Sequence, residues 1–431
     1  MSALITAGIR QTIIPKLRTK SRKLIPIFRG LQKRVAGRYA AAIKAETRRI
    51  PLNKVLMGGE WNWRANRYAY ATGELIRPSI LALEGPHVQF LKQYAACGSP
   101  IFEKTVFSQT AYFRNARNSI RLFGAYFPYC LLPEHIEISA RRFALQYDKR
   151  SVAHLPSEGH SPEGQRISVF TVRESDCYEI DEGNHRVAFA VMNGDESILA
   201  DVVDQPQYTP LQEMILRVEW QSNTREIYQP LELPETKKNW SLLRNSEDRR
   251  NKMMEFLDTH NLTAKRAGKV LDVGSYYGWF VSEFLKRGYD AYGIEHDRTA
   301  ISVGELVYEN VSGRICWDDA GIALRELTER YGISCCLSLM HHYILRNQNG
   351  ISAKELLHLL DLRTEKVLFF EMGEEHEVWF SQSLAGWNKD TIKKWVLENS
   401  SFKRAYELGR DSDSVGVNRG NFSRMLFAFT K

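Results

Sequence analysis

The sequence lacks several features that would assign its class immediately. It has no stretch of about eighteen consecutive apolar residues, the length that a transmembrane helix needs. Cysteine is scarce and none forms a Cys-x-x-Cys pair, which argues against a zinc site. With 43% hydrophobic residues there is enough apolar material for buried cores. Such cysteine usage is typical of a reducing cytoplasm; the cysteines are Cys97, Cys130, Cys177, Cys316, Cys335 and Cys336.

Acidic residues are nearly absent from residues 1–49, which hold thirteen Lys and Arg but only Glu46. That segment carries +12, so the remaining chain carries −4 of the net +8. Apolar residues at helical spacing over 27–43 predict a basic amphipathic helix. Such an arm could lie on an anionic membrane surface on the cytoplasmic side, bind nucleic acid, serve as a transit peptide, or dock on the next domain. We rank the membrane and docking interpretations above the other two.

The chain is organised around the stretch Lys269–Val281, which predicts a buried strand, a turn and a helix over 279–286. Gly274 and Gly278 open space against bare backbone, and the first helical N–H groups point towards a ligand there. Asp272 ends the strand, where open α/β sheets bind ligands. The spacing is neither Gly-x-Gly-x-x-Gly nor that of a P-loop.

A second strand follows over 288–295 and ends in Glu295, whose carboxylate could accept hydrogen bonds from ribose hydroxyls. Asp272 followed by Glu295 resembles the class I S-adenosylmethionine-dependent methyltransferases, over about residues 264–431. The alternative is a doubly wound nucleotide-binding domain without chemistry. The resemblance implies S-adenosyl-L-methionine as cofactor and the following contacts: Asp272, Gly274, Ser275, Tyr276, Gly278, Glu295, His296, Asp318 and Leu339.

The methyl acceptor of this family lies beyond the fourth strand, here predicted over 333–339. His341 and His342 follow it and are placed for base work. The fifth strand, 366–371, ends in Glu371, so we predict His341, His342 and Glu371 as catalytic residues. The acidic loop that follows shows no specific ligand spacing, and no metal is predicted.

Two absent motifs restrict the acceptor. There is no Asp/Asn-Pro-Pro-Tyr/Phe, the motif of DNA and RNA amino-methyltransferases, and no Pro-Cys pair for attack on cytosine. The acidic body also disfavours a large DNA footprint. The pattern looks instead like glycan and small-molecule O-methyltransferases, including those that cap lipopolysaccharide chains, some of which pair a kinase with a methyltransferase. We therefore expect O-methylation of a glycan or glycolipid intermediate, and treat nucleic acid as an unlikely partner.

The N-terminal half has its own pattern: strands over 167–172 and 178–182, a Gly-Asn-His-Arg turn, a helix over 187–192 and a strand over 198–203. This order resembles the ParB/sulfiredoxin-like domain. Backbone N–H groups, a helix start and the Arg186 guanidinium suit a phosphate. The expected phosphate or nucleotide site, with Mg²⁺ if it is catalytic, comprises Asp181, Glu182, Gly183, Asn184, His185 and Arg186. The alternative is a structural Arg186.

Two further segments complete the prediction. Aromatic residues over 50–150 could stack on a sugar, but core packing is the favoured interpretation. A charged helix over 240–257 is expected to present mostly a solvated face, and to lie near the cofactor cleft. The predicted fold is α/β: a class I methyltransferase Rossmann-like doubly wound sheet preceded by a smaller α+β ParB/sulfiredoxin-like domain. The ranges are a basic arm 1–49, the ParB/sulfiredoxin-like domain 50–210, a linker and helix 211–263, and the methyltransferase domain 264–431.

Three functional alternatives stay open. One is a nucleic-acid modifying methyltransferase with a ParB-like DNA-binding or nuclease domain. Another is a bifunctional phosphotransferase-methyltransferase, and the last is a non-catalytic nucleotide sensor.

Overall fold

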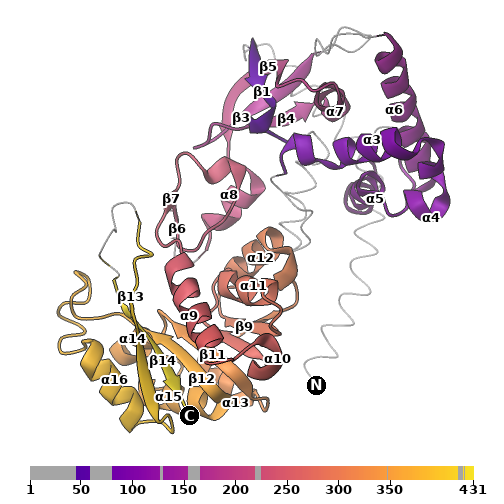
Figure 1. Cartoon of the computed structure of the whole chain (residues 1–431). Coiled ribbons are helices and arrows are strands. Elements are labelled where there is room, and N and C mark those ends of the chain that lie inside the picture. Colours follow the sequence, from indigo (N-terminus) through magenta and orange to yellow (C-terminus); the bar gives the residue numbers. More distant parts are fainter. Residues whose placement is uncertain are drawn as a thin grey trace, which may run out of the picture. The chain divides into compact units, whose positions relative to one another are not determined.

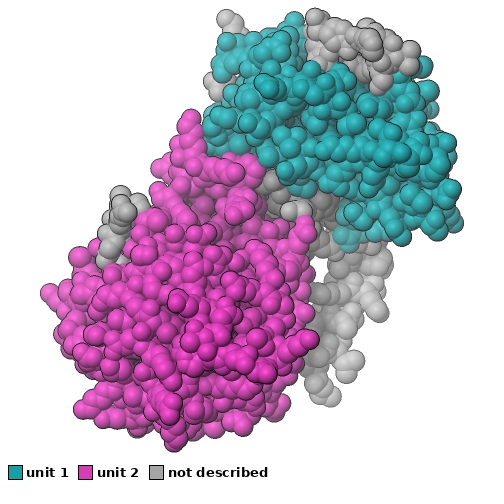
Figure 2. Space-filling model, in the orientation of Figure 1, with its two compact units in different colours: residues 1–210 teal, residues 211–431 magenta. Residues whose placement is uncertain are grey.

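The computed structural model describes residues 45–58, 80–126, 130–153, 166–218, 225–346, 348–415, 421 and 423–431. The chain divides into two compact units, residues 1–210 and 211–431 (Figure 2). The predicted amphipathic helix over 27–43 lies outside the described residues. In the part of the chain that the structure covers, no helix is both long and apolar enough to cross a membrane.

The first unit contains a mixed sheet of five strands in the order β1-β5-β3-β4-β2 (Figure 1). β5 lies antiparallel to β1 and parallel to β3, while β4 lies antiparallel to β3 and parallel to β2. The strands are β1 (Ala45–Pro51), β2 (Val55–Leu56), β3 (Ile167–Val172), β4 (Tyr178–Glu182) and β5 (Ser197–Gln207). The last residues assigned to the arm, 45–49, therefore belong to the sheet.

Helices complete the first unit: α3 (Pro86–Cys97), α4 (Lys104–Phe107), α5 (Ala111–Phe123), α6 (Glu134–Ala153) and α7 (Asn184–Met192). One core packs α7 against the sheet, and a second gathers the aromatic residues of α3, α5 and α6. Tyr112 and Tyr126 are buried, which confirms the core interpretation for them. Other aromatic residues, including Trp61 and Trp63, lie outside the described ranges.

The second unit is built on a sheet of seven strands in the order β10-β9-β8-β11-β12-β14-β13 (Figure 1). Six strands run in one direction and β14 alone is antiparallel to its neighbours. The order reverses between β8 and β11, as in doubly wound α/β folds. This confirms the predicted doubly wound sheet. The strands are β8 (Val270–Val273), β9 (Ala291–Glu295), β10 (Ile315–Trp317), β11 (Tyr331–Leu337), β12 (Thr364–Glu371), β13 (Arg404–Arg410) and β14 (Met425–Thr430).

Side chains alternate between the two faces of this sheet, so each face has its own core. One core joins the sheet to α13, α14, α15 and α16, and the other joins it to α9, α10 and α11. The helices are α9 (Glu247–Thr259), α10 (Ala264–Ala267), α11 (Trp279–Lys286), α12 (Arg298–Val307), α13 (Ala320–Glu326), α14 (Met340–Leu345), α15 (Ala353–Arg363) and α16 (Lys389–Glu398). Cys335 and Cys336 point into opposite cores, and both are buried.

The segment before β8 differs from its prediction. It comprises α8 (Pro210–Ile215), a two-strand ribbon of β6 (Glu226–Ile227) and β7 (Ser241–Leu242), and then α9. The helix predicted from residue 240 begins only at Glu247, because Ser246 adopts the left-handed conformation with φ 63°. The expectation of a mostly solvated face is wrong for two of the three arginines in the predicted range: Arg244 and Arg249 are 0% and 1% exposed.

Candidate functional site

The turn after β8 supplies exposed backbone at the carboxyl edge of the sheet. Gly274 and Gly278 both have φ 78°, a conformation that favours glycine. A Cβ on Gly274 would contact the Leu339 side chain at 3.4 Å, and one on Gly278 would lie 2.5 Å from Ile315 Cδ1. The amide of Gly274 donates to the Ile294 carbonyl at 2.9 Å, and that of Ser275 does so at 3.0 Å. The structure thus places four of the predicted residues at one turn: Gly274, Ser275, Gly278 and Leu339.

Glu295 ends β9 beside this turn. Its Oε2 accepts from the Tyr276 amide at 2.8 Å, and its Oε1 accepts from the amides of His296 and Asp297 at 2.9 Å. The His296 ring lies 2.9 Å from Oε1 as well. Burial raises the pKa of Glu295, but these hydrogen bonds outweigh it and hold the pKa below its usual value. Glu295 is therefore an ionised acceptor fixed against the glycine turn.

Asp272, in β8, has a buried polar atom without a partner: its Oδ2 makes no hydrogen bond. The residue is 2% exposed, and burial raises its pKa to about 7, although the nearby Arg249 charge opposes the shift. A buried carboxyl oxygen without a donor is costly unless a ligand supplies one. The positively charged amino group of S-adenosylmethionine would be such a donor, so the residues present fit this cofactor.

Two residues of the segment before β8 complete the turn, and the sequence prediction missed both. Gln229 is buried, donates to the Ser275 carbonyl at 3.4 Å and accepts from the Trp279 amide at 3.4 Å. The Tyr228 ring packs edge-on against Tyr276 with centroids 5.6 Å apart. Burial raises the pKa of Tyr228, but three nearby guanidinium charges lower it below its usual value. No local signal marks these residues, which fall in a stretch that resembles a linker.

The two predicted histidines follow β11 and have different environments. His341 is 3% exposed, and its Nδ1 accepts from the Gly373 amide at 3.2 Å, which places the proton of the neutral ring on Nε2. Burial and the Arg424 charge lower its pKa well below its usual value. His342 is half-buried, and burial followed by the Arg424 charge also lowers its pKa. The rings lie 4.3 Å apart. Of the two, His342 is the better placed to accept a proton from a substrate.

Glu371 lies at the centre of a buried ion cluster. Its carboxylate contacts Arg249 Nη1 at 3.0 Å, Arg424 Nη1 at 3.1 Å and Arg244 Nη2 at 3.4 Å. Burial raises the pKa of Glu371, but these charges outweigh it and hold the pKa well below its usual value. Ser338 Oγ also donates to Glu371 at 3.1 Å. Glu371 was predicted to be catalytic, but these contacts make it a poor proton acceptor and a good structural anchor.

Further carboxylates extend this cluster. Arg249 donates to Asp413 at 2.6 Å and Arg244 to Asp411 at 2.7 Å. Arg424 forms a bidentate pair with Glu377, with both contacts at 2.7 Å. The cluster, which we call the arginine cluster, comprises Arg244, Arg249, Arg424, Ser338, Glu371, Glu377, Asp411 and Asp413. The sequence prediction missed it, apart from Glu371, because its members are far apart along the chain.

The carboxylates of the acidic loop after β12 are bound by an arginine and by backbone amides. Glu374 forms a bidentate pair with Arg410 at 3.0 Å and accepts from the Met425 amide at 2.7 Å. Glu375 accepts from the Gly386 amide at 2.7 Å. Among the described residues, no three His, Cys, Asp or Glu side chains come together in a way suited to a metal ion.

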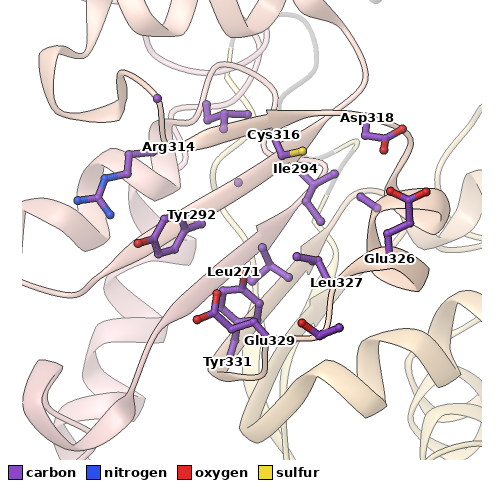
Figure 3. A pocket seen from close by; sticks show the side chains of 15 residues that line it. Leu271, Tyr292, Ile294, Arg314, Cys316, Asp318, Glu326, Leu327, Glu329 and Tyr331 are labelled. Atoms are coloured by element: carbon purple, nitrogen blue, oxygen red, sulfur yellow. The ribbon is translucent and has the colours of Figure 1, made fainter. Parts of the chain in front are cut away.

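A cavity of about 460 Å³ opens along the face of β8, β9 and β10. Among the predicted cofactor residues, its lining includes Asp318. Figure 3 shows Asp318 and Glu326 on one side of this cavity and Tyr292 and Arg314 on the other. The Asp318 amide donates to the Glu295 carbonyl at 3.0 Å, so Asp318 lies beside the end of β9.

The Gly183–Arg186 turn of the first unit opens α7, three residues earlier than predicted. Gly183 has φ 124°, and a Cβ there would lie 3.4 Å from the Arg186 guanidinium. Asn184 Nδ2 donates to the Gly58 carbonyl at 2.7 Å, and His185 stacks on Phe143 with centroids 4.0 Å apart. Burial lowers the pKa of His185 well below its usual value. Asn184 and His185 thus have structural partners, while a phosphate site at the turn stays a prediction.

The acidic residues before this turn lie in β4. Asp181 Oδ2 accepts from Ser168 Oγ at 3.2 Å, and Glu182 is exposed at the strand end. A role for them in holding Mg²⁺ also stays a prediction.

Comparison with known proteins gives distant likenesses. The sequence matches no protein-family model and no curated protein. The bifunctional kinase-methyltransferase WbdD is similar over 51% of this chain and 45% of its own, with 18% identity and a TM-score of 0.40. The match thus spans about half of the WbdD chain.

Two methyltransferases also resemble part of the chain. One is a SAM-dependent methyltransferase from Archaeoglobus fulgidus, over 43% of this chain and 97% of its own, with 16% identity and a TM-score of 0.30. The other is magnesium protoporphyrin IX methyltransferase from Synechocystis PCC 6803 with bound SAM, over 43% and 82%, with 14% identity and a TM-score of 0.30. The strand order and the turn of this chain by themselves define a doubly wound α/β domain.

Proposed function

We propose that residues 211–431 form an S-adenosylmethionine-dependent methyltransferase. The observation that carries the proposal is Asp272 Oδ2, a buried acceptor without a partner beside the Gly274 turn. It lies at the carboxyl edge of β8, next to the point where the strand order reverses. Glu295 supplies a second carboxylate from the adjacent strand. Two acceptors and a bare glycine turn suit a ligand that has an amino group at one end and ribose hydroxyls at the other.

Different residues of the site would contact different parts of the cofactor. Asp272 accepts from its amino group, and Leu339 packs beside the turn. Glu295 Oε2, which among the described residues accepts only from the Tyr276 amide, offers its second lone pair to a ribose hydroxyl. His296 and Asp318 lie near Glu295 and flank the adenine end. S-adenosylmethionine supplies a methyl group already activated on a positively charged sulfur. The protein must therefore exclude water, orient the acceptor and remove its proton.

The environment of His342 favours a hydroxyl group as the methyl acceptor. His342 is half-buried, and its lowered pKa leaves the ring neutral at pH 7 and able to take a proton. His341 holds the adjacent turn: its Nδ1 is bound to the Gly373 amide and its ring packs edge-on against Phe380 at 4.9 Å. General-base catalysis by such a residue contributes about 10²–10⁴-fold.

We further propose a glycan or glycolipid as the acceptor. Trp379, next to Phe380 in the loop after β12, is 46% exposed, and its Nε1 donates to Glu377 at 3.0 Å. That hydrogen bond fixes the indole, and a fixed flat ring can stack on a sugar face. The absence of the amino-methyltransferase motif from the sequence supports the same choice.

The test has two parts. Calorimetry with S-adenosylmethionine should show binding to the full chain, and loss of binding in Asp272→Ala. Incubation with labelled cofactor should then transfer label to a glycan or glycolipid extract and not to DNA. No binding would reject the proposal. Label in DNA would favour the nucleic-acid enzyme, and binding without transfer to any extract would favour the sensor.

A further inference from the structure

Helix α6 of the first unit presents a row of apolar side chains to solvent. In the described part of that unit, five large apolar side chains are exposed, and four of them lie on α6 or in the turn before it. Leu131 and Leu132 precede the helix, and Ile138 and Leu145 are 53% and 54% exposed. The fifth is Val106.

The spacing places the two helical members on one side. Ile138 and Leu145 are seven residues apart, about two turns of helix, so their side chains point in nearly the same direction. Arg142 and Lys149 each follow one of them by four residues and are exposed on the same side. Along the face from Ile138 to Lys149, apolar and basic residues thus alternate.

The acidic residues of α6 are engaged beside this face. Glu137 pairs with Arg141 at 2.8 Å, and Asp148 Oδ2 accepts from Tyr94 Oη at 2.7 Å. Glu134 lies at the helix start. The charge that the exposed face offers between Ile138 and Lys149 is therefore positive.

Two other occupants fit less well. A partner helix in a coiled coil needs a second apolar column three residues after the first. Here those positions are Arg141 and Asp148, which are charged. The basic arm of this chain, with +12 over residues 1–49, would be repelled by Arg142 and Lys149.

We propose that this face of α6, with Leu131 and Leu132, docks on an anionic lipid surface. Apolar side chains would enter the headgroup boundary while the basic residues contact lipid phosphates. The inference does not depend on methyl transfer, and it adds a contact distinct from the N-terminal arm.

The experiment is co-sedimentation of the full chain with phosphatidylcholine vesicles, with and without phosphatidylglycerol. The apolar variant is Ile138→Ser/Leu145→Ser, the charge variant is Arg142→Glu/Lys149→Glu, and the matched control is Val106→Ser. Circular dichroism melting should show that all remain folded, since every substituted side chain is exposed. The wild type should bind the anionic vesicles, the apolar variant should bind about tenfold more weakly, and the control should bind as the wild type does. The charge variant should show a weaker preference for phosphatidylglycerol than the wild type does.

Three outcomes would overturn the proposal. If the wild type binds no vesicles, the α6 face is not a lipid-docking surface. An apolar variant that binds as tightly as the wild type would leave the arm as the anchor. A wild-type dimer in gel filtration that becomes monomeric in the apolar variant, without vesicle binding, would make the face a contact between copies.

Discussion

Arg249 Nη1 lies 3.0 Å from Glu371 Oε2, and both side chains are almost wholly buried. This pair joins α9, which precedes the doubly wound sheet, to the end of β12 at the predicted catalytic edge. Ser338, two residues before Met340 opens α14, is held by the same arginine cluster: Arg244 and Arg424 both donate to its Oγ. The segment before β8 is therefore part of the frame that fixes the turn before the histidines.

The first prediction concerns that frame. Arg249→Met should lower the free energy of unfolding by about 3–5 kcal/mol, because Glu371 and Asp413 would keep buried charges without this partner. Arg249→Lys should recover only part of the loss, since a lysine cannot reproduce the fork. Urea unfolding of the full chain measures both. Arg325→Met is the control, because Arg325 and Glu355 pair at the surface, and it should cost less than about 1 kcal/mol. Equal effects at both positions would mean that the cluster has no special role.

The second prediction is a pH dependence from Asp272. Its folded pKa of about 7 lies above its ordinary value of 3.8, so the folded state holds a proton that the unfolded state has lost. The stability that this proton provides is fully present below about pH 4 and is lost as pH rises through 7, on the order of 4 kcal/mol. In Asp272→Asn this loss should be absent. Unfolding free energies from pH 4 to 8 measure the difference, with Asp290→Asn as an exposed control. Parallel curves for wild type and Asp272→Asn would contradict it.

The third prediction concerns Glu295. Removing its carboxylate in Glu295→Ala should weaken S-adenosylmethionine binding by about 1–3 kcal/mol, as for a charge-assisted hydrogen bond. The Tyr276 amide would also lose its acceptor, so the turn should loosen even without cofactor. Calorimetry gives the affinity, and hydrogen exchange at Tyr276 reports the turn. The control is Glu329→Gln, whose carboxylate is exposed and pairs with Lys269. Unchanged affinity in Glu295→Ala would remove it from the cofactor site.

The fourth prediction separates the histidines. His342→Asn should lower kcat by about 10²–10⁴-fold if it is the proton acceptor, with cofactor affinity unchanged. His341→Asn keeps an acceptor for the Gly373 amide and should retain more activity. Methyl-transfer rates measured against pH distinguish the two histidines. The wild-type rate should decrease at pH values below the lowered pKa of His342, because the ring is then protonated. His342→Asn should not show this decrease. The same decrease in His342→Asn would assign the base elsewhere.

The fifth prediction concerns the Gly183–Arg186 turn. A phosphate-bearing ligand should raise the melting temperature of the full chain, and Arg186→Lys should weaken that effect because lysine lacks the bidentate fork. Nucleoside triphosphates with and without magnesium are the ligands to test. If the shift depends on magnesium, Asp181 and Glu182 become the candidate residues that hold the metal ion. A wild type that shows no shift, together with a destabilised Arg186→Lys, would leave Arg186 structural.

The amino-acid sequence by itself determined the glycine turn and the two carboxylates at the proposed cofactor edge. β8 and β9 are short, mostly apolar runs: β8 carries Asp272 as its third residue and β9 ends in Glu295. The glycines of the turn have conformations that few other residues adopt. These signals are local: Asp272, Gly274, Gly278 and Glu295 all fall within one strand–turn–helix–strand unit. For the same reason the doubly wound sheet could be predicted from the order of its strands.

The tertiary structure alone decided the arginine cluster and the roles around it. Arg249 meets Asp413 across 164 residues, and Arg244 meets Glu371 across 127, so no periodicity or spacing marks the partners. The local sequence pattern of a charged helix is the same whether its arginines face water or pair with buried carboxylates. Glu371 appeared suited to catalysis because it ends a strand, and only its three arginines show that it is an anchor. The buried charges require one another, and that requirement exists only after the chain has folded.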